Sequence, residues 1–100
     1  MPLKILMSWD IQPGREADYF EFVMKEFSPG LVQLGLEPTD AWYTMYGDCP
    51  QVLMGSIVKD MDTAQQALSS DEWHNLQERL MGYVSGYRHK VIRATGGFQL

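Results

Sequence analysis

Three polar side chains of this sequence could move a proton during a reaction. Tyr43 lies in an aromatic stretch, Asp10 follows an apolar one, and His74 lies in a segment with helical spacing. A positioned phenol, carboxylate or imidazole can act as a general acid or base. The sequence therefore predicts Tyr43, Asp10 and His74, in that order, as candidate catalytic residues. Asp71 and Glu78 stand one helical turn on either side of His74, so that face is expected to be solvated.

A second group of residues is aromatic or carries a thioether, and such side chains suit a flat, apolar ligand. The predicted ligand-binding residues are Met7, Trp9, Tyr43 and Met45 beneath the helices, and Phe20, Met24 and Trp73 above them. The same spacings also fit a closed hydrophobic core, and that alternative stays open. Because a buried Trp or Tyr needs a polar partner, we expect Trp9 and Tyr43 to stand at the rim of a cavity.

The sequence predicts neither a metal or cofactor site nor a nucleophilic cysteine. The histidines His74 and His89 belong to no cluster of metal ligands, so no metal and no cofactor are expected. His89 shares a strand face with Tyr87. We expect it to be a structural histidine whose ring nitrogens form ordinary hydrogen bonds. Cys49 has Asp48 beside it and no basic neighbour to favour a thiolate, so a nucleophilic role is not predicted. One cysteine also excludes an internal disulfide.

The first third of the chain predicts a strand and a helix that position these residues. Residues 3–11 alternate between apolar and other side chains, which is typical of a strand. This places Trp9 on the face beneath the helices and Asp10 on the other. Pro13-Gly14 ends the strand, and a helix begins near Arg15. Its predicted buried stripe is Phe20, Val23, Met24 and Phe27. Ser28-Pro29 is interpreted as a break with a fresh cap, and Gly35 as the end of the helical region.

The rest of the chain predicts a hairpin, two helices and a last strand. The aromatic arm around 42–46 and the apolar arm 52–58 flank the turn residues "GDCP". Residues 60–63 cap a short helix, and a longer one begins at Ser69 or Ser70, with Glu72 at capping-box spacing from Ser69. That helix is expected to end at Ser85-Gly86. The charges of the final strand, 87–95, are typical of an edge strand.

The resulting order β-α-β-β-α-β predicts one α+β domain over residues 1–100 with a ferredoxin-like, four-stranded antiparallel sheet. The usual order 4-1-3-2 makes the first and third strands central, and these are the most apolar ones. In this topology the helices cover one face of the sheet, and the other face must be polar or covered. Apolar residues occur on both faces of the hairpin, so we expect a homodimer.

Composition excludes several classes of partner. The 100 residues carry a net charge of -5, which argues against nucleic-acid and anionic-membrane binding. No apolar run approaches the ~20 residues that span a bilayer. The N-terminal "MPLKILMSWDI" lacks the long apolar run and cleavage site of a signal peptide. A cytoplasmic location fits these observations.

The stretches "WDIQPGREADYFEF" and "AQQALSSDEWHNLQERL" resemble the dimeric α/β-barrel superfamily over nearly the whole chain, especially its antibiotic-biosynthesis monooxygenase-like and NIPSNAP-like members. The resemblance implies a barrel of two sheets across a dimer, and a small-molecule pocket between the sheet and helices of each subunit. It also implies a possible cofactor-independent monooxygenase acting on a flat, apolar molecule. The haem-degrading members use a strand Asn, a Trp and a helix His, a set that this sequence lacks.

Two alternatives to an enzyme stay open. The first is a non-catalytic, small-molecule-binding or stress-related homodimer, which would be stabilised by its ligand without turnover. The second is an assembly role without a pocket, which the acidic first helix and basic last strand favour. Salt-sensitive association would be its signature.

Overall fold

The structure is a computed structural model that describes residues 2–44 and 50–93 of the chain. Its elements are β1 Leu3–Ile11, α1 Glu16–Phe22, the π-helical segment η1 Val23–Phe27, α2 Ser28–Gln33, β2 Glu37–Tyr43, β3 Val52–Val58, α3 Met61–Ser69, α4 Asp71–Leu80 and β4 Val84–Arg93. The predictions made for Met45 and Cys49 concern residues outside those described.

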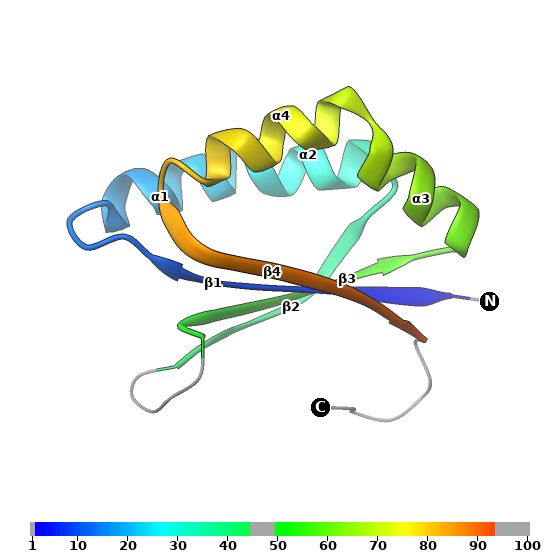
Figure 1. Cartoon of the computed structure of the whole chain (residues 1–100), viewed down its shortest axis with the longest axis horizontal. Coiled ribbons are helices and arrows are strands. Elements are labelled where there is room, and N and C mark those ends of the chain that lie inside the picture. The colour runs from blue at the N-terminus through cyan, green and yellow to red at the C-terminus, as the bar shows by residue number, and fades with distance from the viewer. Residues whose placement is uncertain (1, 45–49, 94–100) are drawn as a thin grey trace.

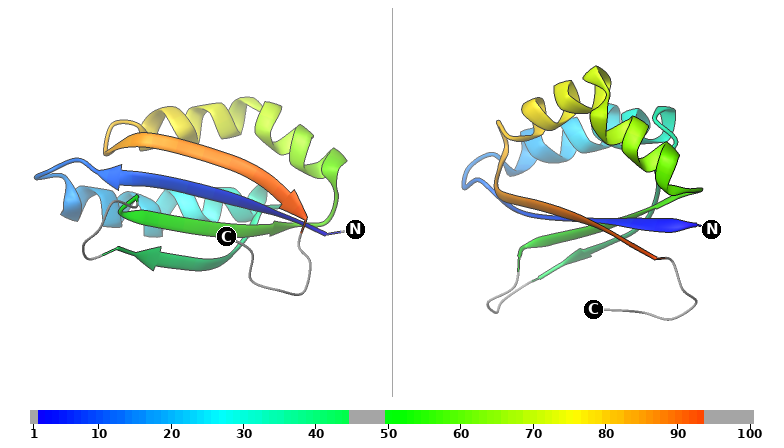
Figure 2. Two further views of the ribbon diagram at one scale, coloured as in Figure 1. Left: turned by 60° about the horizontal axis from the view of Figure 1, so that its bottom comes forward. Right: turned by 45° about the vertical axis from the view of Figure 1, so that its right-hand side comes forward.

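The four strands form one antiparallel sheet in the order β2-β3-β1-β4, which confirms the predicted arrangement. The helices lie together over one face of this sheet, and no described helix covers the other face (Figure 1, Figure 2). The predicted two-layer, ferredoxin-like α+β architecture is therefore confirmed. Among the described residues, no helix combines the length and the apolar character that crossing a bilayer requires.

β1 divides its side chains between the two faces of the sheet. Its odd-numbered residues, from Leu3 to Ile11, are all buried, whereas the residues between them are half-buried or exposed. Successive strand residues point to opposite faces, so the odd-numbered residues lie under the helices. Trp9 therefore faces the helices and Asp10 the uncovered side, which we call the open face, as the alternation predicted.

The first helical region buries a different stripe from the one predicted. Phe20 is 44% exposed and Met24 is 76% exposed, although both were placed on the buried side. The residues of this region that are buried are Tyr19, Phe22, Phe27 and Leu31. The predicted stripe is therefore wrong at Phe20 and Met24 and right at Phe27.

The cause of this difference is the π-helical segment η1. The N–H of Ser28 donates to the carbonyl of Val23, five residues earlier. A π turn holds one residue more than an α turn, so Phe22 and Phe27 can both face the core. Pro29, which has no N–H to donate, stands in the first turn of α2. The chain thus stays helical where the sequence predicted a break at Ser28-Pro29.

Side-chain caps begin the two later helices. Asp60 Oδ1 accepts the N–H of Thr63 at 2.8 Å, as the sequence predicted. Ser70 Oγ accepts the N–H of Trp73 at 3.2 Å, so the cap of α4 is Ser70 rather than the capping box that begins at Ser69. α4 also ends at Leu80, and β4 begins at Val84, before the boundary predicted at residues 85–87.

Candidate functional site

Trp9 lies at the centre of a closed aromatic cluster under the helices. It is fully buried, and its ring centroid lies 6.4 Å from that of Tyr19, 5.9 Å from that of Phe27 and 6.1 Å from that of Tyr87. Its indole Nε1 donates a hydrogen bond to the Tyr19 hydroxyl at 2.9 Å. The polar group of Trp9 is thus satisfied inside the core, and the structure corrects the expectation that this residue stands at the rim of a cavity.

Tyr19 was missed by the sequence analysis because the helix stripe was assigned to the wrong face. The residue is 2% exposed, and its burial raises the pKa of its phenol to about 12, against the lowering effect of the hydrogen bond from Trp9. Tyr19 is therefore a neutral phenol at physiological pH. Its role here is to accept the indole N–H and to connect α1 to β1.

Met7 and Trp73 belong to the same closed core. Their exposed fractions are 0% and 1%. The Trp73 ring reaches from α4 to within 6.2 Å of Phe27 and 6.4 Å of Tyr87, measured between centroids. Three of the predicted ligand-binding residues are thus brought together, but as packed core residues that line none of the hollows described below.

Phe20 and Tyr43 form an exposed pair that we call the aromatic ledge. Their rings stack with centroids 5.8 Å apart and planes 27° apart, and the residues are 44% and 46% exposed. Partial burial and the nearby Glu16 carboxylate raise the pKa of the Tyr43 phenol. Its hydroxyl therefore keeps its proton at neutral pH and can donate it to a ligand. Met24 follows Phe20 by four residues on the same helical region and is more exposed still.

The structure does not bring the three predicted catalytic residues together. Tyr43 pairs with the buried Val52, which places its side chain on the helix side of the sheet. Asp10 points to the open face, where its Oδ1 accepts the N–H of Gln51 at 2.9 Å and so connects the end of β1 to the residue that precedes β3. His74 is exposed on α4, as its acidic neighbours indicated.

A different pair of polar groups does meet on β4. The Tyr87 hydroxyl lies 2.9 Å from His89 Nδ1, and the imidazole ring meets the Trp73 ring edge-on at 6.4 Å between centroids. Burial raises the pKa of the Tyr87 phenol, so this group is protonated and donates to Nδ1 when the imidazole carries its proton on Nε2. The signal in the sequence was the spacing of two residues on one strand, which places both side chains on one face.

The described residues offer no group of three His, Cys, Asp or Glu side chains that could hold a metal ion. Ser56 Oγ is buried and has no hydrogen-bond partner among them. It lies on the helix side of β3, between core residues, and lines none of the hollows described here.

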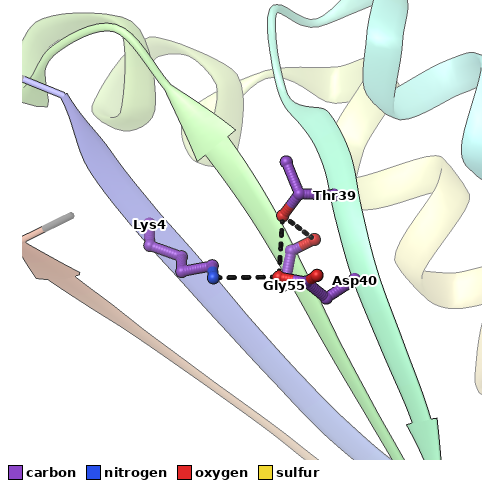
Figure 3. Close-up of polar contacts among 4 residues, drawn as sticks. All are labelled: Lys4, Thr39, Asp40 and Gly55. Atoms are coloured by element: carbon purple, nitrogen blue, oxygen red, sulfur yellow. Dashed lines mark hydrogen bonds and ion pairs between the residues drawn. The ribbon is translucent and has the colours of Figure 1, made fainter. Parts of the chain in front are cut away.

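The open face of the sheet carries a groove of about 410 Å³, lined by Leu6, Ser8, Pro50, Leu53, Arg88, His89 and Lys90. Beside it, Lys4 reaches from β1 across β3 to Asp40 on β2, with Nζ 3.0 Å from Oδ2 (Figure 3). Gly55 permits this crossing, because a Cβ there would lie 3.0 Å from Lys4 Cε. The open face is therefore partly apolar and partly charged.

A second hollow, of about 660 Å³, lies on the outer side of the helices, between α2 and α4. Its lining mixes both signs of charge, and one wall contains the ion pair of Arg79 with Glu26. Both of these hollows thus lie outside the layer between sheet and helices. The pocket that the resemblance implied in that layer is occupied, among the described residues, by the Trp9 cluster.

Neither a protein-family model nor a curated protein sequence matches this chain. Solved structures of similar fold include a NIPSNAP family protein from Agrobacterium tumefaciens, at TM-score 0.73 and 15% identity over 95% of this chain and 94% of that one. They also include SnoaB, a cofactor-independent oxygenase from Streptomyces nogalater, at TM-score 0.69 and 14% identity over 93% and 92% of the two chains.

A DABB family protein with a ferredoxin-like fold from Mesorhizobium loti is similar at TM-score 0.73 and 6% identity, over 95% of this chain and 98% of that one. Similarities at such low identity concern the fold alone. The chain has a ferredoxin-like α+β fold, which it shares with these NIPSNAP, DABB and oxygenase structures.

Proposed function

We propose that this protein is a homodimer that binds a flat, apolar small molecule at the aromatic ledge. The observation that carries the proposal is the stacking of Phe20 on Tyr43, with both rings close to half exposed. A planar ligand can extend this stack and remove apolar surface from water. The Tyr43 hydroxyl can donate a hydrogen bond that orients the ligand.

The closed core supports the ledge from behind. The Phe20 ring packs edge-on against Tyr19 with centroids 5.2 Å apart, and Tyr19 is held in turn by its hydrogen bond from Trp9. A binding surface is more precise when packed neighbours fix its side chains. In this proposal Met7, Trp9 and Trp73 contribute to binding as the rigid support of the ledge rather than as ligand contacts.

The proposed homodimer is supported by the composition of the open face. Leu6, Leu53 and Ile57 point to this face and are half-buried, and Trp42 is 38% exposed. A sheet face of this kind is usually covered by another layer. A standard interface buries about 800 Å² per partner, which is about an eighth of the 6456 Å² surface of this chain.

Titration with 1-naphthol tests the ledge directly, because this probe combines a flat apolar body with a hydrogen-bonding oxygen. We expect the wild-type protein to bind it in isothermal titration calorimetry. Tyr43→Phe should weaken binding about two- to tenfold through loss of one hydrogen bond, and Phe20→Ala should weaken it at least as much. Met61→Ala is the matched control, since Met61 is 48% exposed on α3 and should leave affinity unchanged. Equal affinity in all four proteins would exclude the ledge as the binding site.

A second candidate function, oxygenation without a cofactor, is favoured by the Tyr87–His89 pair. Such an enzyme must bind an electron-rich polycyclic substrate, assist its deprotonation and exclude water while oxygen reacts. A hydrogen-bonded phenol and imidazole can assist the proton transfer. Oxygen uptake with 1-naphthol that falls strongly in His89→Gln would favour this function, whereas thermal stabilisation without oxygen uptake would favour binding alone.

A further inference from the structure

We infer that the flat ligand of the aromatic ledge is a cation whose positive charge is delocalised over a planar heteroaromatic ring. This inference rests on the proposed function, and it adds the charge of the ligand that the ledge selects. It follows from the two exposed rings, from an acidic side chain beside them, and from the partners of the neighbouring charges.

The rings of the aromatic ledge attract positive charge and are not occupied by a cation of the described chain. The face of a phenyl or phenol ring is electron-rich and attracts a cation that lies within about 6 Å of its centroid. Within the described part of the chain, two arginines lie over aromatic rings: Arg15 over Tyr83 and Arg79 over Phe22. Neither lies over the ledge, so its rings can receive a cation from a ligand.

Glu16 supplies negative charge beside these rings. It stands in the first turn of α1, four residues before Phe20, and side chains at this spacing are neighbours on a helix. Partial burial and, after it, the Glu16 carboxylate raise the pKa of the Tyr43 phenol, so the negative charge also acts on the second ring of the ledge. Both rings therefore lie in the field of one carboxylate.

The other two acids of α1 already have basic partners. Asp18 Oδ2 lies 3.5 Å from Arg15 Nη1, and Glu21 Oε1 lies 3.2 Å from Lys25 Nζ. Glu16 forms no ion pair with any residue that the structure describes. The ledge is thus bordered by one carboxylate whose charge a ligand can still balance.

This distribution of charge separates three classes of flat ligand. An anion would meet the Glu16 carboxylate, and such a contact between like charges opposes binding. A neutral ring gains stacking but no attraction to the charge. A compact ammonium group is strongly hydrated, whereas a planar, delocalised cation is weakly hydrated and stacks on aromatic faces. The last class alone combines the shape that extends the Phe20–Tyr43 stack with the charge that complements Glu16.

Three bicyclic probes of similar size test the inference by isothermal titration calorimetry. 1-Methylquinolinium is a delocalised cation, quinoline is its uncharged parent at neutral pH, and 1-naphthoate is an anion. We expect the cation to bind at least about threefold tighter than quinoline, and 1-naphthoate to bind most weakly. Raising the salt concentration from about 20 to about 500 mM should weaken binding of the cation but not of quinoline, because salt screens charge.

Glu16→Gln removes the charge while keeping the shape of the side chain. It should weaken binding of 1-methylquinolinium about two- to fivefold and leave quinoline and 1-naphthol unaffected. Asp62→Asn is the matched control, because it changes the net charge equally at an exposed acid in the first turn of another helix, α3. The helices α1 and α3 stand at opposite ends of the helical layer (Figure 1). This control should bind all probes like the wild type, and circular dichroism checks that each variant folds.

The possible failures of this inference and of the proposed function are distinct. Binding of 1-naphthol at the ledge, without preference for the cation over quinoline, would overturn the inference and leave the proposed function intact. Failure of every probe to bind would overturn both. Equal weakening by Glu16→Gln and Asp62→Asn would show that the cation responds to net charge alone, and full affinity in Phe20→Ala would place the cation away from the rings. Either of these results would also overturn the inference.

Discussion

The hydrogen bond from Trp9 to Tyr19 joins the central strand β1 to the first helix inside the core. Both partners are buried, so neither can exchange the other for water. A buried donor left without an acceptor costs about 1–3 kcal/mol. This bond explains why an aromatic residue that carries a polar group can stand in the middle of a closed layer.

Tyr19→Phe should therefore lower the free energy of unfolding by about 1–3 kcal/mol at neutral pH, because it leaves the indole N–H unpaired without opening a cavity. Urea denaturation measures this change. Tyr43→Phe is the matched control: its hydroxyl makes no hydrogen bond to a described residue and its stability should change by less than about 0.5 kcal/mol. Equal stability of the two variants would contradict the structural role given to Tyr19.

Alkaline pH should destabilise the protein through the same residue. The pKa of the Tyr19 phenol is about 12 in the folded chain, against 10.0 without burial. The unfolded chain therefore loses this proton first, and stability that is complete below pH 10 declines as the pH rises from 10 towards 12. Burial of the Tyr87 phenol acts in the same direction. Urea midpoints measured across this range should fall less steeply for Tyr19→Phe than for the wild type; parallel curves would contradict the assignment.

Strands and helices were predictable wherever the apolar residues keep one spacing through the whole segment. The alternation of β1 placed Trp9 and Asp10 on the correct faces. The strand order expected for this topology, with which the apolar character of β1 and β3 agreed, is the order observed. The phase of the first helix was not predictable in this way. A π turn contains one residue more than an α turn. The buried stripe predicted at α-helical spacing therefore wrongly included Phe20 and Met24.

The contact between α2 and α4 depends on a glycine. A Cβ on Gly30 would lie 2.6 Å from Leu76 Cδ1 and 3.2 Å from Cδ2, so the two helices could not keep their present separation without movement of the leucine. Alanine favours a helix over glycine by about 1 kcal/mol, whereas overpacking costs about 1–3 kcal/mol. The two effects oppose each other at this position.

Gly30→Ala should accordingly destabilise the wild-type chain but stabilise a Leu76→Ala chain, in which the space for the new methyl group exists. Urea denaturation of the four proteins of this double-mutant cycle measures the coupling, which we expect at about 1–3 kcal/mol. The same stabilisation in both backgrounds would show that the helices do not meet closely at Gly30.

On the scale of the whole molecule, the sequence predicted the layer that Trp9 and Trp73 occupy but not whether the space within that layer is filled. Trp9 and Trp73 were correctly placed in the layer between sheet and helices, and there they pack against Phe27 and Tyr87. Whether rings that face each other pack closely or border a cavity depends on the distances between the sheet and the helices. The spacing of residues along the sequence does not give those distances.

A chain that depends on a second copy to cover its open face should become more heat-resistant as its concentration rises. Dissociation accompanies unfolding of a homodimer, so mass action favours the folded state at high concentration. For two chains of this size we expect the thermal midpoint to rise by about 3 °C for each tenfold increase in concentration. Differential scanning calorimetry from about 1 to about 100 µM measures this shift by the same mass-action relation. A wild-type midpoint that does not vary with concentration would show that one copy of the sheet is stable in water with its open face uncovered.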